Sequence, residues 1–256
     1  MIEREIAQEI LNALPGQVEE PRLLLVGVGG AGINMLRAMG SQEGFRRVAI
    51  DTDDYALALS QVPRQIHLRT DLPRGTGGDP DIGQAAARRQ GEDLRRTLEG
   101  DSVIILAGLG RGTGTGVAPE VARMAKEAGI PVFALLAWPF QDEGLAATAQ
   151  NGLGVLETSC DGLVVLDNES AIALPGIEGK RDAALMVNAM MGGMLLDLYD
   201  RVQEALPFSL QEELADFMES VGEAGSELPV RAAYGRGPRR DPRPLPLDAE
   251  GVVQFR

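Results

Sequence analysis

The stretch that decides the fold reads Gly108-Leu109-Gly110-Arg111-Gly112-Thr113-Gly114-Thr115-Gly116. It follows the apolar run Val103 to Ala107 and precedes a segment with a helical pattern. A glycine-rich loop that leaves a strand and opens a helix presents backbone N–H groups, and the positive end of the helix dipole, to an anion. Glycine also lets a phosphate approach without a Cβ in the way. The alternation of Thr113 and Thr115 with glycine, and Pro119 in an expected first helical turn, favour a phosphate loop over a flexible connection.

Strands and helices alternate on both sides of this loop. Segments expected to form strands occur at Leu23 to Val28, Val48 to Ile50, Ser102 to Ala107, Pro131 to Leu136 and Gly162 to Leu166, and Gln65 to Leu68 is a possible further strand. Helical patterns occur at Ile33 to Met39, Gln84 to Leu98, Ala118 to Ala128 and Asp182 to Ala205. This order predicts an α/β fold with a doubly wound, mostly parallel sheet in a single domain. Ligands of such sheets bind beyond the carboxyl ends of the strands, where the glycine-rich loops of this chain fall.

The charge of the chain excludes some classes of partner. The 256 residues carry a formal net charge of −14, whereas general binding to nucleic acids or to anionic membranes needs a basic surface. Hydrophobic residues make up 44% of the chain, which is enough for a core. No signal-peptide pattern is present, and no apolar run reaches the roughly 18 residues of a membrane-spanning helix. We therefore expect a cytoplasmic protein with no transmembrane segment and no nucleic-acid partner.

Two residue types limit the metal and redox chemistry of the chain. Cys160 is the single cysteine, so no disulfide can form within the chain. His67 is the single histidine, so no cluster of cysteine and histidine metal ligands exists. His67 also falls in an expected strand, and we interpret it as an ordinary strand residue.

The two glycine-rich loops are compatible with two different classes of cofactor. Gly27, Gly29 and Gly32 match the dinucleotide fingerprint G-x-G-x-x-G, and Asp51 lies near the distance of an acid that binds a ribose hydroxyl. An NAD-binding enzyme is therefore one hypothesis. The dinucleotide-binding fold does not, however, require a second phosphate loop after a later strand. A Walker-type site is excluded, because neither lysine of the chain follows a glycine loop. A polyphosphate would be neutralised by amides, threonine hydroxyls, helix dipoles and a Mg²⁺ ion.

The signature loop carries a resemblance to a known family. Gly110 to Gly116 resembles the GGGTGTG signature of the tubulin/FtsZ GTPases, with Arg111 in place of the second glycine. The resemblance continues, in order, through Gly27 to Asn34, Val48 to Asp53, Arg74-Gly75, Pro139-Phe140 with Glu143-Gly144, and Asn168. It covers roughly residues 22 to 206 and suggests bacterial FtsZ-type cell-division GTPases as relatives.

This resemblance implies a set of contacts to a guanine nucleotide. The first glycine loop would bind the phosphates through Gly29, Gly30 and Ala31, and the signature loop through Gly112, Thr113 and Gly114. Further expected cofactor-binding residues in these two segments are Asn34, Gly110, Arg111, Thr115 and Gly116. Glu143 would bind a sugar hydroxyl, whereas a family arginine four residues later corresponds here to Ala147. Asn168 and Asn188 would read the guanine edge. The implied cofactors are GTP or GDP with Mg²⁺, and no side chain is named as a metal ligand.

The chain departs from the family pattern at three places. The family's acidic loop, close to Asn-x-Asp-Phe-Ala-Asp, is replaced here by residues 208–217, where Glu212 and Glu213 could orient a water in the site of a neighbouring subunit. Such acids are also common at helix starts because they suit the dipole. About fifty residues follow Leu206, too few for the family's second domain of about a hundred residues. Arg111 could pair with the phosphates, occupy the γ-phosphate space, or make a subunit contact.

Together these observations predict four segments and one main function. The segments are an N-terminal amphipathic helix and linker at 1–20, an FtsZ-like GTP-binding domain with its central helix at 21–206, a remnant of the catalytic-loop region at 207–222, and a flexible Pro/Arg-rich tail at 223–256. The predicted function is that of a guanine-nucleotide-binding protein and a slow or partner-dependent GTPase, linked to bacterial cell division or filament regulation. Its expected partners are a full-length FtsZ-type protein or a second copy of the chain. The alternatives are a non-hydrolysing interaction module with bound nucleotide and an NAD-binding enzyme.

Overall fold

The computed structural model describes residues 23–40, 45–98, 102–204 and 230–235. Its strands are β1 Leu23–Val28, β2 Phe45–Asp51, β3 Arg64–His67, β4 Ser102–Gly108, β5 Val132–Trp138, β6 Gly162–Asp167 and β7 Val230–Gly235. Its helices are α2 Gly29–Met39, α3 Asp54–Ala58, α4 Pro80–Arg89, α5 Gly91–Leu98, α6 Gly112–Glu127, α7 Ala146–Ser159, α8 Asn168–Ile172 and α9 Lys180–Glu204, with a short 3₁₀ turn, η1, at Gln141–Glu143. The predicted N-terminal helix and the 207–222 segment lie outside the described residues.

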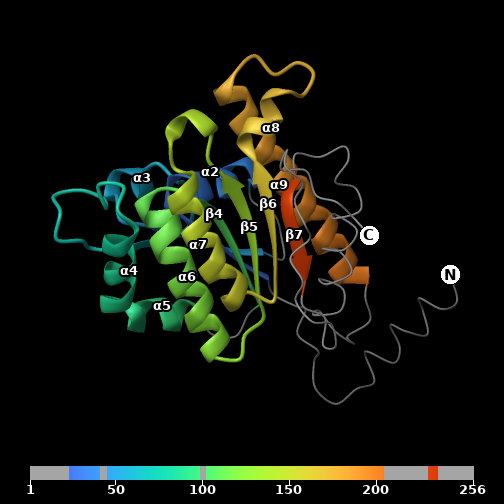
Figure 1. The fold of residues 1–256 in the computed structure, drawn as a ribbon. Coiled ribbons are helices and arrows are strands. Elements are labelled where there is room, and N and C mark those ends of the chain that lie inside the picture. Colours follow the sequence, from blue (N-terminus) through green and yellow to red (C-terminus); the bar gives the residue numbers. More distant parts are fainter. Residues whose placement is uncertain (1–22, 41–44, 99–101, 205–229, 236–256) are drawn as a thin grey trace, which may run out of the picture.

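The strands form one sheet in the order β3-β2-β1-β4-β5-β6-β7 (Figure 1). The first six strands pair in parallel, and β7 pairs antiparallel with β6. Strands β1 and β4 are parallel neighbours, so their carboxyl ends lie beside each other, and the strand order reverses direction between them. The predicted α/β fold with a doubly wound, mostly parallel sheet is confirmed.

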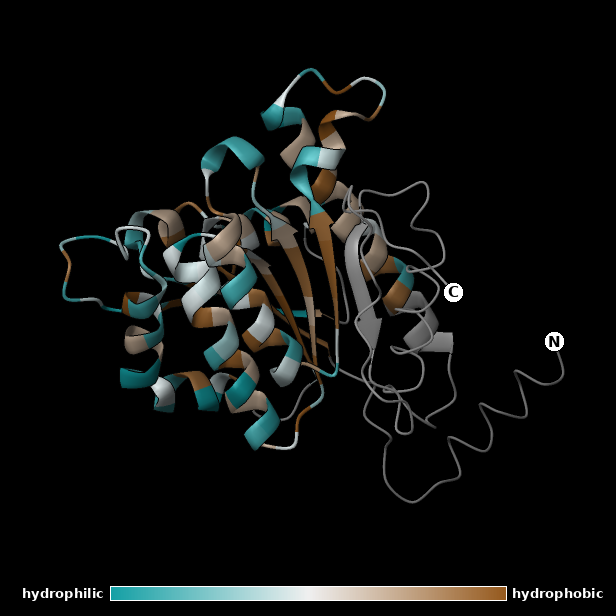
Figure 2. Ribbon diagram, viewed as in Figure 1, coloured by the Kyte–Doolittle hydropathy of each residue, from teal (hydrophilic) through white to brown (hydrophobic). Residues whose placement is uncertain are grey.

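Helices cover both faces of the sheet (Figure 2). Two hydrophobic clusters of buried side chains fill the space between the sheet and these helices. Leu23 and Leu25 of β1 point to the face that α2, α8 and α9 cover. Leu24 and Val26 point to the opposite face, against α4, α5, α6 and α7. Successive side chains of a strand alternate between faces, so a strand buried on both faces must be apolar at every position. The continuous apolar run from Leu23 to Val28 meets that requirement, because all six residues are buried.

The helices begin earlier than predicted at both glycine loops. Helix α6 begins at Gly112, not at Ala118, so Pro119 lies inside the helix and not in its first turn. Helix α2 likewise begins at Gly29. The low helix propensity of glycine is overridden at these loops by packing, because the first turns lie against the backbone of neighbouring elements. The glycines of the signature loop therefore form the first turns of a helix.

Other differences from the prediction arise from short or weakly patterned segments. Helices α3, α7 and α8 were not predicted, and the helix expected at Gln84 to Leu98 is split into α4 and α5 around Gln90. Strand β7 lies within the segment that was predicted to be a flexible tail. Its antiparallel pairing with β6 explains the strand, because the edge of β6 offers unpaired backbone groups.

Several glycines are required by close contacts between backbones. A Cβ added at Gly32 of α2 would lie well under 3.0 Å from the carbonyl oxygen of Leu106 in β4. A Cβ at Gly114 would meet the carbonyl oxygen of Gly108, and one at Gly116 would meet that of Pro80. These contacts hold the first turns of α2 and α6 against the end of β4 and against α4.

Replacement of Gly32 by alanine tests this packing. In a helix, glycine to alanine normally stabilises by about 0.5–1 kcal/mol, but here the new methyl group overlaps a backbone carbonyl, so we expect Gly32→Ala to destabilise by about 1–3 kcal/mol. The matched control is Gly154→Ala in α7, where an added Cβ meets nothing within 4 Å, and we expect it to be neutral or stabilising. Urea unfolding of both variants measures the difference. Equal stabilities would contradict the close packing of α2 on β4.

Candidate functional site

Two helices begin side by side at the carboxyl end of the sheet without a cap. Helix α2 follows β1 and helix α6 follows β4, the neighbour of β1. Neither helix has a side-chain cap or an acidic residue in its first turn. In contrast, Asp53, Asp79 and Asp167 cap helices α3, α4 and α8 through hydrogen bonds to backbone N–H groups. The first N–H groups of a helix have no partner within it, so the two uncapped N-termini together form an anion-binding arrangement.

The two glycine loops touch each other at the helix starts. Gly29 has φ 71°, and a Cβ added there would lie 3.1 Å from the backbone nitrogen of Gly114 and 3.3 Å from the Cβ of Thr113. Gly30 and Ala31 are exposed, and a Cβ added at Gly30 would meet nothing within 4 Å. The structure thus brings the two predicted phosphate loops together and leaves an open side at Gly30.

Several residues of the signature loop that are predicted to bind the cofactor make contacts within the protein. The backbone N–H of Gly110 donates to the hydroxyl of Thr115 at 2.8 Å, and Thr115 is buried. Gly116 packs against the backbone of Pro80, and Gly112 lies close to the hydroxyl of Thr76. These contacts fix the shape of the signature loop. Contacts of Gly110, Thr115 and Gly116 with a ligand stay a prediction.

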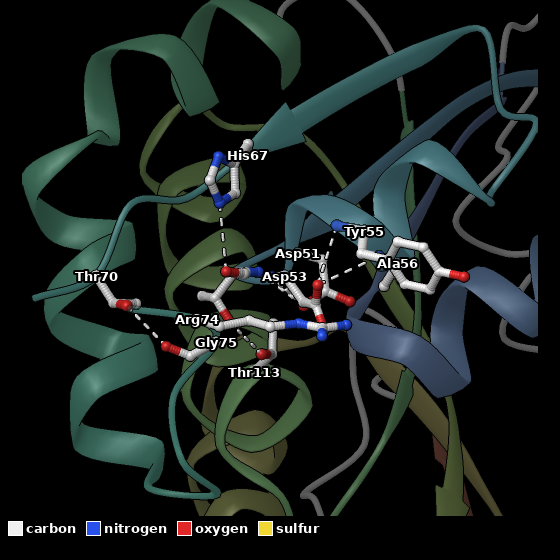
Figure 3. Close-up of polar contacts among 10 residues, drawn as sticks. Asp51, Asp53, Tyr55, Ala56, His67, Thr70, Arg74, Gly75 and Thr113 are labelled. Atoms are coloured by element: carbon white, nitrogen blue, oxygen red, sulfur yellow. Dashed lines mark hydrogen bonds and ion pairs between the residues drawn. The ribbon is translucent and has the colours of Figure 1, made fainter. Parts of the chain in front are cut away.

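Polar groups at the end of β2 hold the start of α6 in place (Figure 3). The hydroxyls of Thr52 and Thr113 are 2.7 Å apart, and the Oδ1 atom of Asp51 accepts hydrogen bonds from the N–H groups of Thr52 at 2.7 Å and Asp53 at 3.2 Å. Burial raises the pKa of Asp51 and outweighs the opposing hydrogen bonds from these N–H groups and from Thr113. The carboxylate of Asp51 is buried and engaged, which disfavours the ribose contact that the NAD hypothesis requires.

The loop before α4 is anchored to the same strand end (Figure 3). The Nε of Arg74 donates to Asp53 Oδ2 at 2.9 Å, and the guanidinium lies 5.3 Å from the ring centroid of Tyr55. The N–H of Gly75 donates to the carbonyl oxygen of Thr52 at 3.2 Å. Burial alone would raise the pKa of Asp53, but the hydrogen bond from Arg74, two backbone N–H groups and the charge of Arg74 hold it below its ordinary value.

Two of these residues were not predicted as part of the site. Thr52 contacts Thr113, and Thr76 contacts Gly112, each across a long distance in the sequence. Both residues fall in loops at the carboxyl edge of the sheet. That position was the only feature of the sequence that could have indicated a role in the site. The predicted strand residue His67 ends β3, where its Nε2 lies 3.3 Å from the carbonyl oxygen of Thr52.

The turn after β5 connects the signature loop with the helices on the other side of the site. Glu143 Oε1 accepts a hydrogen bond from Arg111 at 2.7 Å, and its Oε2 accepts one from the N–H of Phe140 at 3.1 Å. The N–H of Gln141 donates to Glu169 of α8 at 3.0 Å. Lys180, the first residue of α9, forms an ion pair with Asp142 in the same turn. The turn η1 is therefore held by α6, α8 and α9.

A cavity of about 570 Å³ lies between α2 and α9 and brings two predicted residues together. Asn34 and Asn188 both line it, together with Arg37, Arg47 and Arg181. Asn168 begins α8 and is half-buried, next to Glu169 in the contact described above. Asn34 and Asn188 thus line the same cavity, whereas Asn168 is not among its lining residues and instead precedes Glu169, which contacts η1.

The predicted catalytic pair, Glu212 and Glu213, lies outside the described residues. Within the described ranges, no three or more His, Cys, Asp or Glu side chains gather as a metal site. Asp51 and Asp53 are both engaged in hydrogen bonds, so a Mg²⁺ ion here would be held mainly by phosphate oxygens and water, as this ion commonly is.

None of the helices in the described part of the chain is long and apolar enough to cross a membrane.

Asp51 and Asp53 predict opposite pH effects on stability. The raised pKa of Asp51 means that its ionisation opposes folding, so the penalty is complete above its folded-state pKa and disappears as the pH falls toward that of an unfolded aspartate. We expect Asp51→Asn to be at least as stable as the wild type at pH 7 and to lose that advantage as the pH falls toward 4. Asp53→Asn is the matched control: its depressed pKa stabilises the fold above the unfolded value, so this variant should lose about 1 kcal/mol or less at pH 7 and approach the wild type in acid. Urea unfolding at both pH values measures this, and equal pH profiles for the two variants would contradict it.

Comparison with known proteins identifies the family of the chain. The sequence profile described as the Tubulin/FtsZ family, GTPase domain, matches residues 22–175. The cell division protein FtsZ of Methanothermobacter thermautotrophicus is 34% identical over 178 residues, which are 67% of this chain and 45% of the relative. Cell division protein FtsZ 2 of Methanocaldococcus jannaschii is 38% identical over 168 residues, or 63% of this chain and 44% of the relative. The chain thus spans less than half of the length of these curated relatives.

Solved structures of the same family share the fold. An empty FtsZ dimer from M. jannaschii has a TM-score of 0.68 and 29% identity, and the match covers 81% of this chain and 61% of that one. A GTPγS-bound protofilament of CetZ2 from Haloferax volcanii has a TM-score of 0.65 and 25% identity, with 76% and 62% of the two chains covered. The profile spans more than half of the chain and includes both glycine loops. The chain therefore belongs to the tubulin/FtsZ family and contains its GTPase domain.

Proposed function

We propose that the chain binds a guanine nucleotide with its phosphates between the N-termini of α2 and α6. The observation that carries this proposal is the pair of adjacent, uncapped helix starts, neither of which has an acidic residue in its first turn. The N–H groups of Gly30 and Ala31 would bind the phosphates on one side, and those of Gly112, Thr113 and Gly114 on the other. Mg²⁺ would then be bound through the phosphate oxygens.

The remaining residues of the site support the guanine and ribose contacts. Asn34 and Asn188 line one cavity, and an asparagine side chain offers both a donor and an acceptor to the edge of a base. Glu143 lies in a turn that joins the phosphate loop to α8 and α9, where a sugar would lie between phosphate and base. Asn168 follows directly after β6 and precedes Glu169, which accepts a hydrogen bond from that turn. These contacts favour guanosine nucleotides over NAD.

Hydrolysis of GTP is proposed to be slow or to depend on a second molecule. The three carboxylates identified beside the phosphate loops, Asp51, Asp53 and Glu143, all accept hydrogen bonds from the protein, so none is poised to activate water. Glu212 and Glu213 would supply that function to a neighbouring subunit. A dimer and a protofilament occur among the structural relatives, which supports self-association or joining of a filament as the context for hydrolysis.

The engagement of these carboxylates also favours a second candidate, a non-hydrolysing interaction module with structural nucleotide. Denaturing the purified protein and identifying the released nucleotide by chromatography separates the candidate functions. We expect GDP or GTP, whereas NAD would contradict the guanine proposal. Bound GTP that persists over hours would favour the non-hydrolysing module.

A substitution at Gly30 tests the position of the phosphates. Gly30→Leu adds a side chain to open space at the start of α2, so we expect the fold to be retained and nucleotide affinity to fall by at least about tenfold, or about 1.4 kcal/mol. Gly154→Leu adds the same side chain to open space on α7 and should leave affinity unchanged. Calorimetric titration with GTP measures the affinities. Equal affinities for both variants would place the ligand elsewhere.

The filament hypothesis needs a separate measurement. We expect the protein, mixed with a homologous FtsZ that includes the family's second domain, to change the amount of pelleted polymer and the rate of GTP turnover. Glu212→Gln combined with Glu213→Gln should reduce the change in turnover and leave nucleotide binding intact. If pelleting and turnover are both unaffected by the protein, the filament role is wrong.

A further inference from the structure

Arg111 occupies the position of the signature loop that accepts a side chain most easily. Its backbone is extended, with φ −110° and ψ 165°, whereas Gly110 has φ 103°. A Cβ at Gly112 or Gly114 would overlap neighbouring atoms of the protein. A side chain at position 111 therefore costs no backbone strain, and it projects from the N-cap of α6 at the edge of the proposed phosphate site.

The guanidinium of Arg111 is held by the residue proposed to bind the ribose. Its Nη2 lies 2.7 Å from Glu143 Oε1, and the other carboxylate oxygen accepts the N–H of Phe140. Both oxygens of Glu143 are thus in use within the protein. The side chain of Arg111 is 72% exposed and that of Glu143 is 26% exposed, so the pair lies at the surface of the site.

The guanidinium in an ion pair of this kind can leave its carboxylate for an anion that binds it more strongly. Exposed pairs contribute little to stability, because solvent already screens the charges and the side chains lose entropy. A phosphate carries more charge than a carboxylate and accepts the planar guanidinium through two parallel hydrogen bonds. The nearby guanidinium of Arg74 is already bound to Asp53 and stacked on Tyr55. Arg111 is therefore the cation of the signature loop that an additional phosphate would attract.

We propose that Arg111 makes this site selective for nucleoside triphosphates over diphosphates by exchanging its partner. With a diphosphate, Arg111 stays paired with Glu143. With a triphosphate, the guanidinium turns to the terminal phosphate and releases Glu143 Oε1 to a sugar hydroxyl. The exchange couples the number of phosphates to recognition of the ribose, and it rests on the guanine-nucleotide site proposed above.

The test compares nucleotide affinities of the nucleotide-free full chain with those of three variants. For Arg111→Ala we expect GTP affinity to fall by about tenfold while GDP affinity stays level or rises. Arg111→Lys should retain part of the preference, because it keeps the charge but not the planar fork. Arg96→Ala removes the same charge from a surface pair with Glu92 on α5 and should change neither affinity. Thermal unfolding of all variants should coincide with that of the wild type.

A second readout addresses the release of Glu143. In the wild type, removal of both sugar hydroxyls should weaken the triphosphate, as 2′,3′-dideoxy-GTP, more than it weakens the corresponding diphosphate. In Arg111→Ala, Glu143 is free in both states, so the diphosphate should become equally sensitive to the sugar. Equal losses of GTP and GDP affinity in Arg111→Ala, or unchanged sugar sensitivity of the diphosphate, would overturn the exchange. A wild-type protein that binds neither GTP nor GDP would instead overturn the proposed function.

Discussion

The contact of two helix starts with the end of the sheet is the constraint on which this structure depends. Gly32 and Gly114 lie against the backbone carbonyls of Leu106 and Gly108, at distances that leave no room for a side chain. Because strands β1 and β4 are neighbours, these contacts bring the N-termini of α2 and α6 together. The anion-binding arrangement is thus a consequence of backbone packing, which fixes it before any ligand arrives.

Charge in the site is distributed around that contact. Aspartates cap helices α3, α4 and α8, but none lies at the first turn of α2 or α6, so the two dipoles stay available to an anion. The acids that do approach are restrained by the protein. Asp51 is buried among backbone N–H groups, Asp53 is paired with Arg74, and Glu143 is paired with Arg111. This arrangement lowers repulsion toward a polyphosphate in a chain with a net charge of −14.

The sequence predicted most strands closely but several helices poorly. The apolar run Leu23 to Val28 coincides with β1, because burial on both faces demands an apolar residue at every position. Helix α7 carries two glycines and a weak apolar pattern, and its Gly152 packs closely against Thr115 of α6, a contact that no local pattern reveals. The start of α6 was placed too late for the same reason. The family resemblance pointed to both glycine loops, which the structure brings together, but it did not separate glycines that pack from glycines that face open space.

The sequence by itself determined the alternation of strands and helices, the positions of both glycine loops and the family of the chain. These properties are local, since burial and turn chemistry act on neighbouring residues. The tertiary structure decided which distant residues come together: Arg111 pairs with Glu143, and Asn34 and Asn188 line one cavity. Those meetings follow from the order of strands in the sheet and from the packing of α2 and α9 on one face. Local periodicity carries no information about the strand order or about this helix packing, because both join segments far apart in the chain.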